Sequence, residues 1–116
     1  MIDVQINIDC ADAAALRAFY CAALGYVPRD SAGQYTSCVP EPGTNGTTIV
    51  FQQVPEPKSV KNRVHLDLIV DDIESEAERF VGLGATRVSS EPVCEFGCRW
   101  IVMLDPEGNE VCLCDS

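Results

Sequence analysis

The fold of this chain is decided by residues 63–72, which read RVHLDLIVDD. Apolar residues at positions 66, 68 and 70 alternate with His65 and Asp67, which is the period of a strand with one apolar and one polar face. Asp71 follows, and Glu74 comes three residues later, a spacing typical of the capping box that begins a helix. The stretch therefore predicts a strand that leads directly into a helix. The only histidine of the chain is then on the face that the helix does not cover.

Length, composition and charge limit the class of protein. A chain of 116 residues with 47% hydrophobic and 22% charged residues is expected to form one soluble globular domain. Eighteen acidic against eight basic residues give a net charge of −10, which disfavours nucleic-acid and anionic-membrane partners. No apolar run reaches the roughly 20 residues that span a bilayer, and the first residues do not resemble a signal peptide. We therefore expect a cytoplasmic protein, with its seven cysteines reduced.

An earlier copy of the same strand lies near the N-terminus. Residues 4–8, VQINI, align with residues 64–68, VHLDL, which places Gln5 over His65. Residues 46–51 align in the same way with residues 108–113, which places Val50 over Cys112. A supersecondary unit that occurs twice predicts two similar half-sheets around a shared space.

The complete pattern is β-α-β-β-β, repeated once. It predicts an α+β fold of two βαβββ modules, with eight strands and two main helices, in which a curved mixed sheet surrounds a cup. The first module covers about residues 1–54, a proline-rich linker covers 55–62, and the second module covers about 63–116. Helices are expected at 13–24 and 72–83, and strands at 4–9, 47–54, 64–70, 86–88, 99–104 and 110–114, with two more between 26 and 38.

The strand faces that look away from the two helices carry an unusual number of polar side chains. A face that served only as core would be apolar, so these residues indicate a cup that holds water or a ligand. Trp100 and Tyr35 are expected to form walls of this cup. The predicted cup face consists of Gln5, Asn7, Asp9, Val50, Gln52, His65, Asp67, Cys112 and Cys114.

Three interpretations of His65 are open: a metal ligand, a general base, and a strand histidine that lines a pocket. Asp67 faces the same way, and an inward carboxylate needs a partner. That partner is either the cavity shared with His65 or a salt bridge to Arg63 or Lys61. Cys112 is near this pair in the predicted fold, either as a thiol of the site or as a small apolar residue of the core.

The chain resembles the vicinal oxygen chelate superfamily, which includes glyoxalase I, bleomycin-resistance and fosfomycin-resistance proteins and extradiol dioxygenases. The resemblance spans residues 1–116 and is greatest to small bacterial glyoxalase-like domains. It implies the glyoxalase/bleomycin-resistance fold and a homodimer in which a second chain completes the cup. The segments that carry it are FY at 19–20, LGY at 24–26, HLDLIVD at 65–71, LGA at 83–85 and DPEGNE at 105–110.

The resemblance also implies where a divalent metal would be bound. The four ligand positions of the family fall on Gln5, Val50, His65 and Cys112. Valine has no donor atom, and a thiolate is a soft ligand where these enzymes present a hard carboxylate. We therefore expect no metal cofactor of the usual kind. If zinc, nickel or iron does bind, the implied ligands are Gln5, His65 and Cys112.

These considerations lead to two hypotheses of different classes. The first is a small-molecule-binding protein of the bleomycin-resistance type, without the usual metal site. The second is a lyase or isomerase, metal-dependent or metal-free, in which His65 and Asp67 move a proton on a small carbonyl substrate. Ligand contacts are expected from Gln5, Asn7, Val50, Gln52, Trp100 and Cys112.

Overall fold

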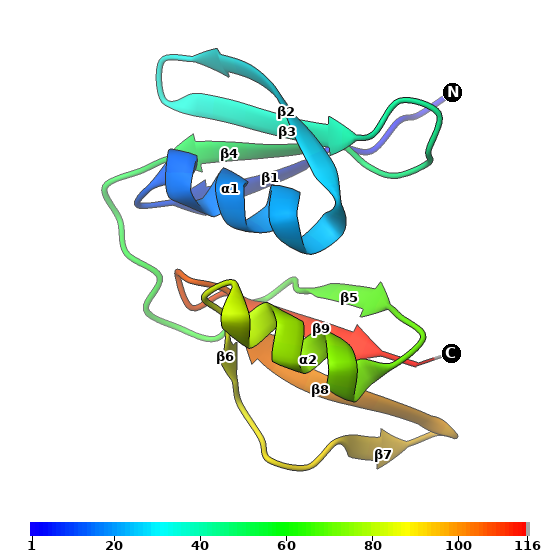
Figure 1. The fold of residues 1–116 in the computed structure, drawn as a ribbon. Helices are drawn as coiled ribbons and strands as arrows, with labels where there is room; N and C mark the ends of the chain where they lie inside the picture. The colour runs from blue at the N-terminus through cyan, green and yellow to red at the C-terminus, as the bar shows by residue number, and fades with distance from the viewer. Residues whose placement is uncertain (116) are drawn as a thin grey trace. The chain divides into compact units, whose positions relative to one another are not determined.

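The computed structural model describes residues 1–115, which form two compact units that divide between Lys58 and Ser59 (Figure 1). Each unit contains one mixed sheet and one helix packed on a face of that sheet. Neither helix in residues 1–115 is long and apolar enough to cross a membrane.

The first unit is a sheet of four strands with one helix. The strand order is β1-β4-β3-β2, in which β1 and β4 are parallel and the other neighbours are antiparallel. Its elements are β1 (Ile6–Cys10), α1 (Ala13–Leu24), β2 (Tyr26–Ala32), β3 (Tyr35–Pro40) and β4 (Ile49–Gln53).

Helix α1 begins and ends where its capping residues predict. The side chain of Asp12 accepts a hydrogen bond of 3.0 Å from the backbone N–H of Ala15. Gly25 ends the helix with a φ of 70°, a left-handed conformation that glycine adopts without a steric penalty. Tyr20 of the helix stacks on Phe51 of β4 with ring centroids 5.7 Å apart, and both side chains are fully buried. This contact fixes the face of the sheet that α1 covers.

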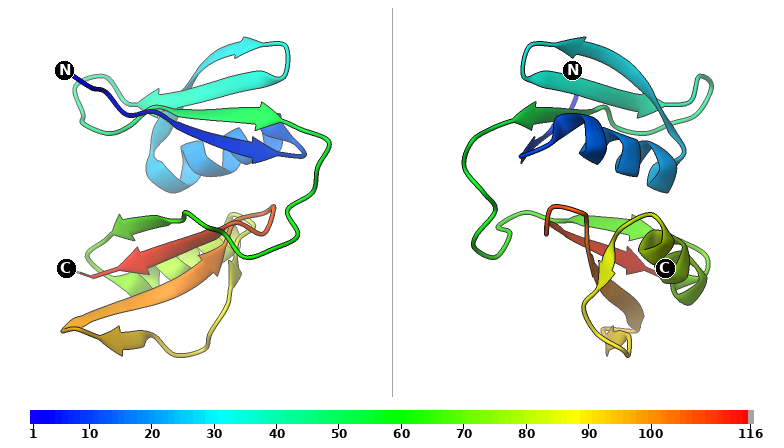
Figure 2. Two further views of the ribbon diagram at one scale, coloured as in Figure 1. Left: turned by 180° about the vertical axis from the view of Figure 1, so that it is seen from behind. Right: turned by 60° about the vertical axis from the view of Figure 1, so that its left-hand side comes forward.

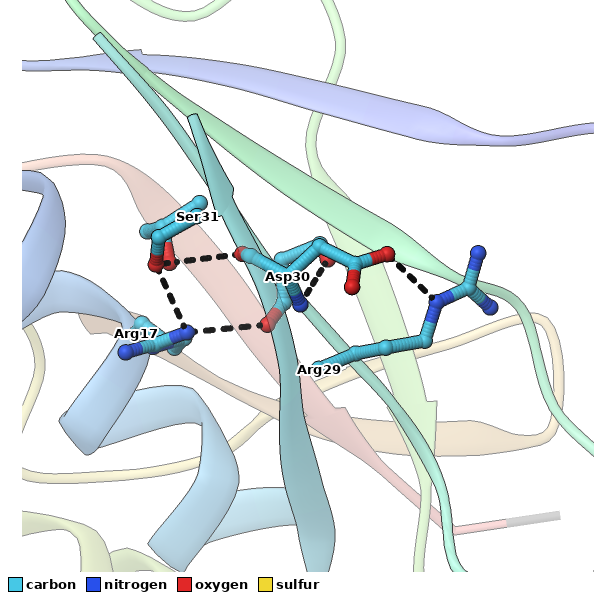
Figure 3. Close-up of polar contacts among 6 residues, drawn as sticks. Arg17, Arg29, Asp30 and Ser31 are labelled. Atoms are coloured by element: carbon cyan, nitrogen blue, oxygen red, sulfur yellow. Dashed lines mark hydrogen bonds and ion pairs between the residues drawn. The ribbon is translucent and has the colours of Figure 1, made fainter. Parts of the chain in front are cut away.

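A bulge in β2 is held by polar contacts with α1 and β3 (Figure 3). Arg17 of α1 donates to the Ser31 hydroxyl and to the Ser37 carbonyl oxygen, both at 3.4 Å. The hydroxyls of Ser31 and Thr36 lie 2.7 Å apart, and Thr36 donates to the carbonyl of Asp30 at 3.1 Å. Because these bonds satisfy the groups that leave the strand ladder, we assign this network to the fold of the first unit.

The second unit repeats this plan, with one more short strand at one edge of its sheet (Figure 2). Its strand order is β5-β9-β8-β6, with β7 also paired to β8, and β5 and β9 are parallel. Its elements are β5 (Leu66–Ile69), α2 (Ile73–Gly82), β6 (Thr86–Arg87), β7 (Val93–Glu95), β8 (Cys98–Leu104) and β9 (Glu110–Cys114).

Helix α2 begins one residue later than its capping-box spacing predicts. Asp72, rather than Asp71, is the N-cap, and its carboxylate accepts a 3.0 Å hydrogen bond from the N–H of Ser75. Adjacent aspartates are both competent caps, and capping at Asp72 lets Ile73 enter the buried stripe together with Phe80. Packing of the stripe thus selects between the two caps.

The predicted α+β fold of two repeated βαβββ modules is confirmed, with differences in strand bounds. In the first module β1 begins at Ile6, so Gln5 lies before it, and two differences occur in the second module. A short additional strand, β7, gives nine strands in residues 1–115 where eight were predicted. Strand β5 is shorter than predicted, so His65 lies immediately before it. The cup between the modules and the homodimer stay predictions.

Candidate functional site

The second sheet has a face that α2 does not cover, and we call it the open face of the second unit. Asp67 of β5 is in register with Cys112 of β9, which is in register with Val102 of β8. Directly paired residues of neighbouring strands point to the same side of a sheet. The side chains between them along the strands, such as Ile101 and Leu113, are fully buried on the opposite side. The register therefore places the carboxylate of Asp67 beside the thiol of Cys112 on the open face, together with apolar residues such as Val102.

Three groups of this face meet closely enough to act together. The Nε2 atom of His65 lies 3.3 Å from an oxygen of Asp67. These two atoms and the sulfur of Cys112 all lie within 4.8 Å of one another. The side chains of His65 and Asp67 are 39% and 59% exposed, whereas Cys112 is buried. The cluster thus has a fixed, buried member and two members that reach solvent.

Burial and charge determine the state of the thiol. Removal from water, and to a lesser degree the neighbouring carboxylate of Asp67, together raise the pKa of Cys112 to about 11. The same two causes raise the pKa of Cys114, the next residue of β9 on this face. Because the thiolate is the nucleophile, a protonated Cys112 is poorly suited to nucleophilic catalysis at neutral pH.

The segment before His65 is attached to the first residue of β9, Glu110. Lys61 places its ammonium group 2.8 Å from both carboxylate oxygens of Glu110, and this hydrogen bond lowers the pKa of the carboxyl group. The side-chain oxygen of Asn62 accepts a 3.0 Å hydrogen bond from the N–H of Glu110. Lys61 is therefore engaged by Glu110, and the close partner of Asp67 is His65.

A turn holds the two strands that carry the other residues of the open face. Asp105 is buried, and one of its oxygens accepts from the N–H groups of Glu107 and Asn109 at 2.8 and 3.0 Å. The side-chain amide of Asn109 donates to the other oxygen at 3.0 Å. This turn sets the β8–β9 register that places Trp100 opposite Cys114.

The predicted residues of the first unit lie on its own open face. Asn7 donates a hydrogen bond of 3.4 Å to the side chain of Gln52. Val50 lies in register with Asn7, and Gln5 is exposed immediately before β1. Within this unit the structure therefore groups Asn7, Val50 and Gln52. That Gln5 approaches His65 stays a prediction.

The metal implied by the resemblance does not fit this chain. Val50 offers no donor, and the buried thiol of Cys112 replaces a hard oxygen ligand. The structure instead brings His65 and Cys112 together with Asp67, which was predicted on the cup face and as a partner of His65 but not as a metal ligand. Its spacing of two residues from His65 was the available signal, because such residues share a strand face.

An open hollow of about 300 Å³ lies at the other end of β5. It is lined by Ile69 and the start of α2, including Asp71, Asp72 and Glu76. Its charged lining is entirely acidic, and none of the clustered groups of the open face takes part.

Two sheets, each built from a βαβββ module, define a class of protein known from solved structures. The chain superposes with a TM-score of 0.80 on a glyoxalase/bleomycin resistance protein/dioxygenase family enzyme from Burkholderia phytofirmans, with 20% identity over 98% of both chains. A fosfomycin resistance protein from Mesorhizobium loti superposes with a TM-score of 0.75 and 16% identity, over 100% of this chain and 94% of the other. A member of the glyoxalase/bleomycin resistance protein/dioxygenase superfamily from Sphaerobacter thermophilus superposes with a TM-score of 0.71 and 21% identity, over 100% of this chain and 98% of the other.

The family model of the glyoxalase-like domain matches residues 5–114. The chain therefore belongs to the glyoxalase-like domain family, within the vicinal oxygen chelate superfamily. No curated protein matches it.

Proposed function

We propose that this protein binds a small organic molecule against the open face of its second unit, without the usual hard divalent metal of the superfamily. The observation that carries the proposal is the cluster of His65, Asp67 and Cys112 on the sheet face opposite α2. A sheet face that served only for packing would be apolar, whereas binding sites combine apolar walls with a few convergent polar groups. Half-buried Trp100, also on this face, supplies an aromatic wall.

The chemistry of the cluster favours binding over the reactions of metal-dependent relatives. The imidazole of His65 and the carboxylate of Asp67 can anchor a ligand by hydrogen bonds from an exposed position. Cys112 is held protonated by burial and contributes shape rather than a nucleophile. Asn7 and Gln52 offer further amide groups on the first unit.

A second function is favoured by the distance of 3.3 Å between His65 and Asp67. A carboxylate at this position can accept a hydrogen bond from the imidazole and orient it, as required of a general base. We propose as the alternative a metal-free lyase or isomerase that moves a proton on a small carbonyl substrate. Turnover of such a substrate that is lost in both His65→Ala and Asp67→Asn would favour this alternative.

Two further proposals follow from membership of the superfamily. We propose a homodimer in which a second chain completes the binding cup, and a cytoplasmic location for a chain with seven free thiols. Light scattering of the reduced protein tests the dimer, for which twice the mass of one chain is expected. A monomer at micromolar concentration would refute it.

Thermal-shift screening against small carbonyl acids and antibiotics tests the binding function. A ligand present at 100 times its Kd should add about 2.7 kcal/mol to the free energy of unfolding. We expect a hit whose stabilisation is lost in Asp67→Asn but kept in Asp71→Asn, an exposed aspartate outside the cluster. Equal loss in both variants, or stabilisation by divalent metals alone, would contradict the proposal.

A further inference from the structure

We propose that Cys21 and Cys38 form a reversible redox site in the first unit, where a low-molecular-weight disulfide such as glutathione disulfide joins them into a bond between α1 and β3. Both cysteines are free thiols in the structure. The proposed ligand-binding function makes no use of either residue. The proposal therefore stands on the contact between these two thiols and on their surroundings.

The register of the first sheet directs Cys38 toward α1. Cys38 of β3 pairs with Ile49 of β4, and two residues away Thr36 pairs with Phe51. Residues two apart on a strand point to the same face, and Phe51 stacks on Tyr20 of α1. This is therefore the face that the helix covers, and the side chain of Cys38 is fully buried there.

Cys21 reaches the same place from the helix. It is half-buried, follows the buried Tyr20, and lies one turn after Arg17 on the same side of α1. The thiols of Cys21 and Cys38 are hydrogen-bonded to each other. A disulfide requires sulfur atoms about 2.05 Å apart, which two contacting thiols reach by rotation of their side chains. The pair is thus assembled before any oxidant arrives.

The surroundings give the two thiols different roles. Burial first, and then the charge and the hydrogen bond of Cys21, raise the pKa of Cys38 to about 12. Burial also raises the pKa of Cys21, but the hydrogen bond from Cys38 and the positive charge of Arg17 oppose this rise. Cys21 is also the more exposed of the two. Cys21 is therefore the thiol that attacks an oxidant from solvent, and Cys38 is the one that resolves the product.

Two thiol–disulfide exchanges form the bond. The thiolate of Cys21 attacks one sulfur of glutathione disulfide, which breaks the S–S bond and releases one glutathione thiolate. The sulfur of Cys38 then attacks the sulfur of Cys21 and expels the second glutathione. The two protons lost by the protein thiols end on the two glutathione thiols. Excess reduced glutathione reverses both steps, as expected of a transient disulfide in a reducing compartment.

The cysteine pairs of the second unit are less suited to such a bond. Glu95 of β7 pairs with Cys98, so Cys94, the residue before Glu95, points to the opposite face of the sheet. Cys112 and Cys114 are two residues apart along β9, which separates their Cβ atoms by roughly 6.5 Å. A disulfide requires about 3.5–4.5 Å between these atoms. Oxidation inside one chain should therefore select the pair in the first unit.

Peptide mapping of the full chain after incubation with glutathione disulfide tests the site. Free thiols are alkylated under denaturing conditions, and trypsin then places Cys21 in residues 18–29 and Cys38 in residues 30–58, each as the only cysteine of its peptide. We expect these two peptides to be joined by a disulfide and to separate on reduction. The rate of joining should rise about tenfold per pH unit near neutral pH, because the thiolate is the attacking form.

Two variants and a melting experiment complete the test. The oxidised wild type should melt about 5–10 °C above the reduced protein, since the bond closes a short loop, and Cys21→Ser should show no such difference. The matched control Cys94→Ser/Cys98→Ser, which removes the exposed thiols, should form the same bond. Glutathione that stays on Cys21 without a bond to Cys38 would overturn the proposal. Modification of Cys94 and Cys98 alone, or loss of the bond in the control, would do the same.

Discussion

Replacing Asp105 by alanine should destabilise the chain and loosen the strands that carry Trp100 and Cys112. The buried carboxylate accepts three hydrogen bonds, from the backbone of Glu107 and from the backbone and side chain of Asn109, at 2.8–3.0 Å. A bond to a charged group contributes about 1.5–3 kcal/mol, and water can hydrate part of the freed N–H groups because Glu107 and Asn109 are only half-buried. We therefore expect Asp105→Ala to cost about 2–4 kcal/mol in the free energy of unfolding.

Urea unfolding followed by circular dichroism measures this cost. With a slope of about 2 kcal/mol per molar urea, the midpoint should fall by about 1–2 M. Asp105→Asn is the graded control, since the amide keeps one oxygen acceptor but loses the contact to the side chain of Asn109. Its cost should be about 1 kcal/mol. An Asp105→Ala midpoint equal to that of the wild type would refute this account of the turn.

Three further predictions concern the first unit. Gly46→Ala should lower the melting temperature and release the hydrogen bond from Thr47 to Tyr26, because an added Cβ would lie 2.5 Å from the Tyr26 hydroxyl; unchanged melting would contradict this. Phe51→Ala should lower the free energy of unfolding, measured by urea denaturation, by about 3–5 kcal/mol, since the ring is fully buried. A loss below about 1 kcal/mol would contradict this by showing that the core repacks. Burial raises the pKa of Cys38 to about 12, so its contribution to stability is complete below pH 9 and should be lost as the pH rises toward 12. Urea midpoints between pH 8 and 11 should fall less steeply in Cys38→Ala than in the wild type, and equal slopes would refute the assignment.

Much of the fold could be predicted because local signals and the internal repeat agree. Helix α1 covers the predicted residues 13–24, because Asp12 caps its N-terminus and Gly25 ends it. The predicted N-cap of α2 was wrong by one residue. Asp71 and Asp72 are chemically equivalent, and the packing of Ile73 decides between them. Short strands such as β7 depend on pairing with β8, which periodicity over three residues does not reveal.

The candidate site was predicted less completely. The strand period places His65 and Asp67 on one face, and the repeat points to Cys112, but neither gives the distances among their donor atoms. The register of β5 on β9, which sets Asp67 opposite Cys112, comes from long-range pairing. Recognition that Asp67 lies close to both His65 and Cys112 therefore required the structure.

The single histidine allows the central claim, ligand binding at the open face of the second unit, to be tested directly. The imidazole signals of His65 are the only histidine resonances of the chain in an NMR spectrum. They can be followed during titration with any compound that raises the melting temperature in the screen. We predict that they shift in proportion to occupancy and stop shifting at saturation. A compound that stabilises the protein to saturation while the His65 signals remain unchanged would contradict the claim.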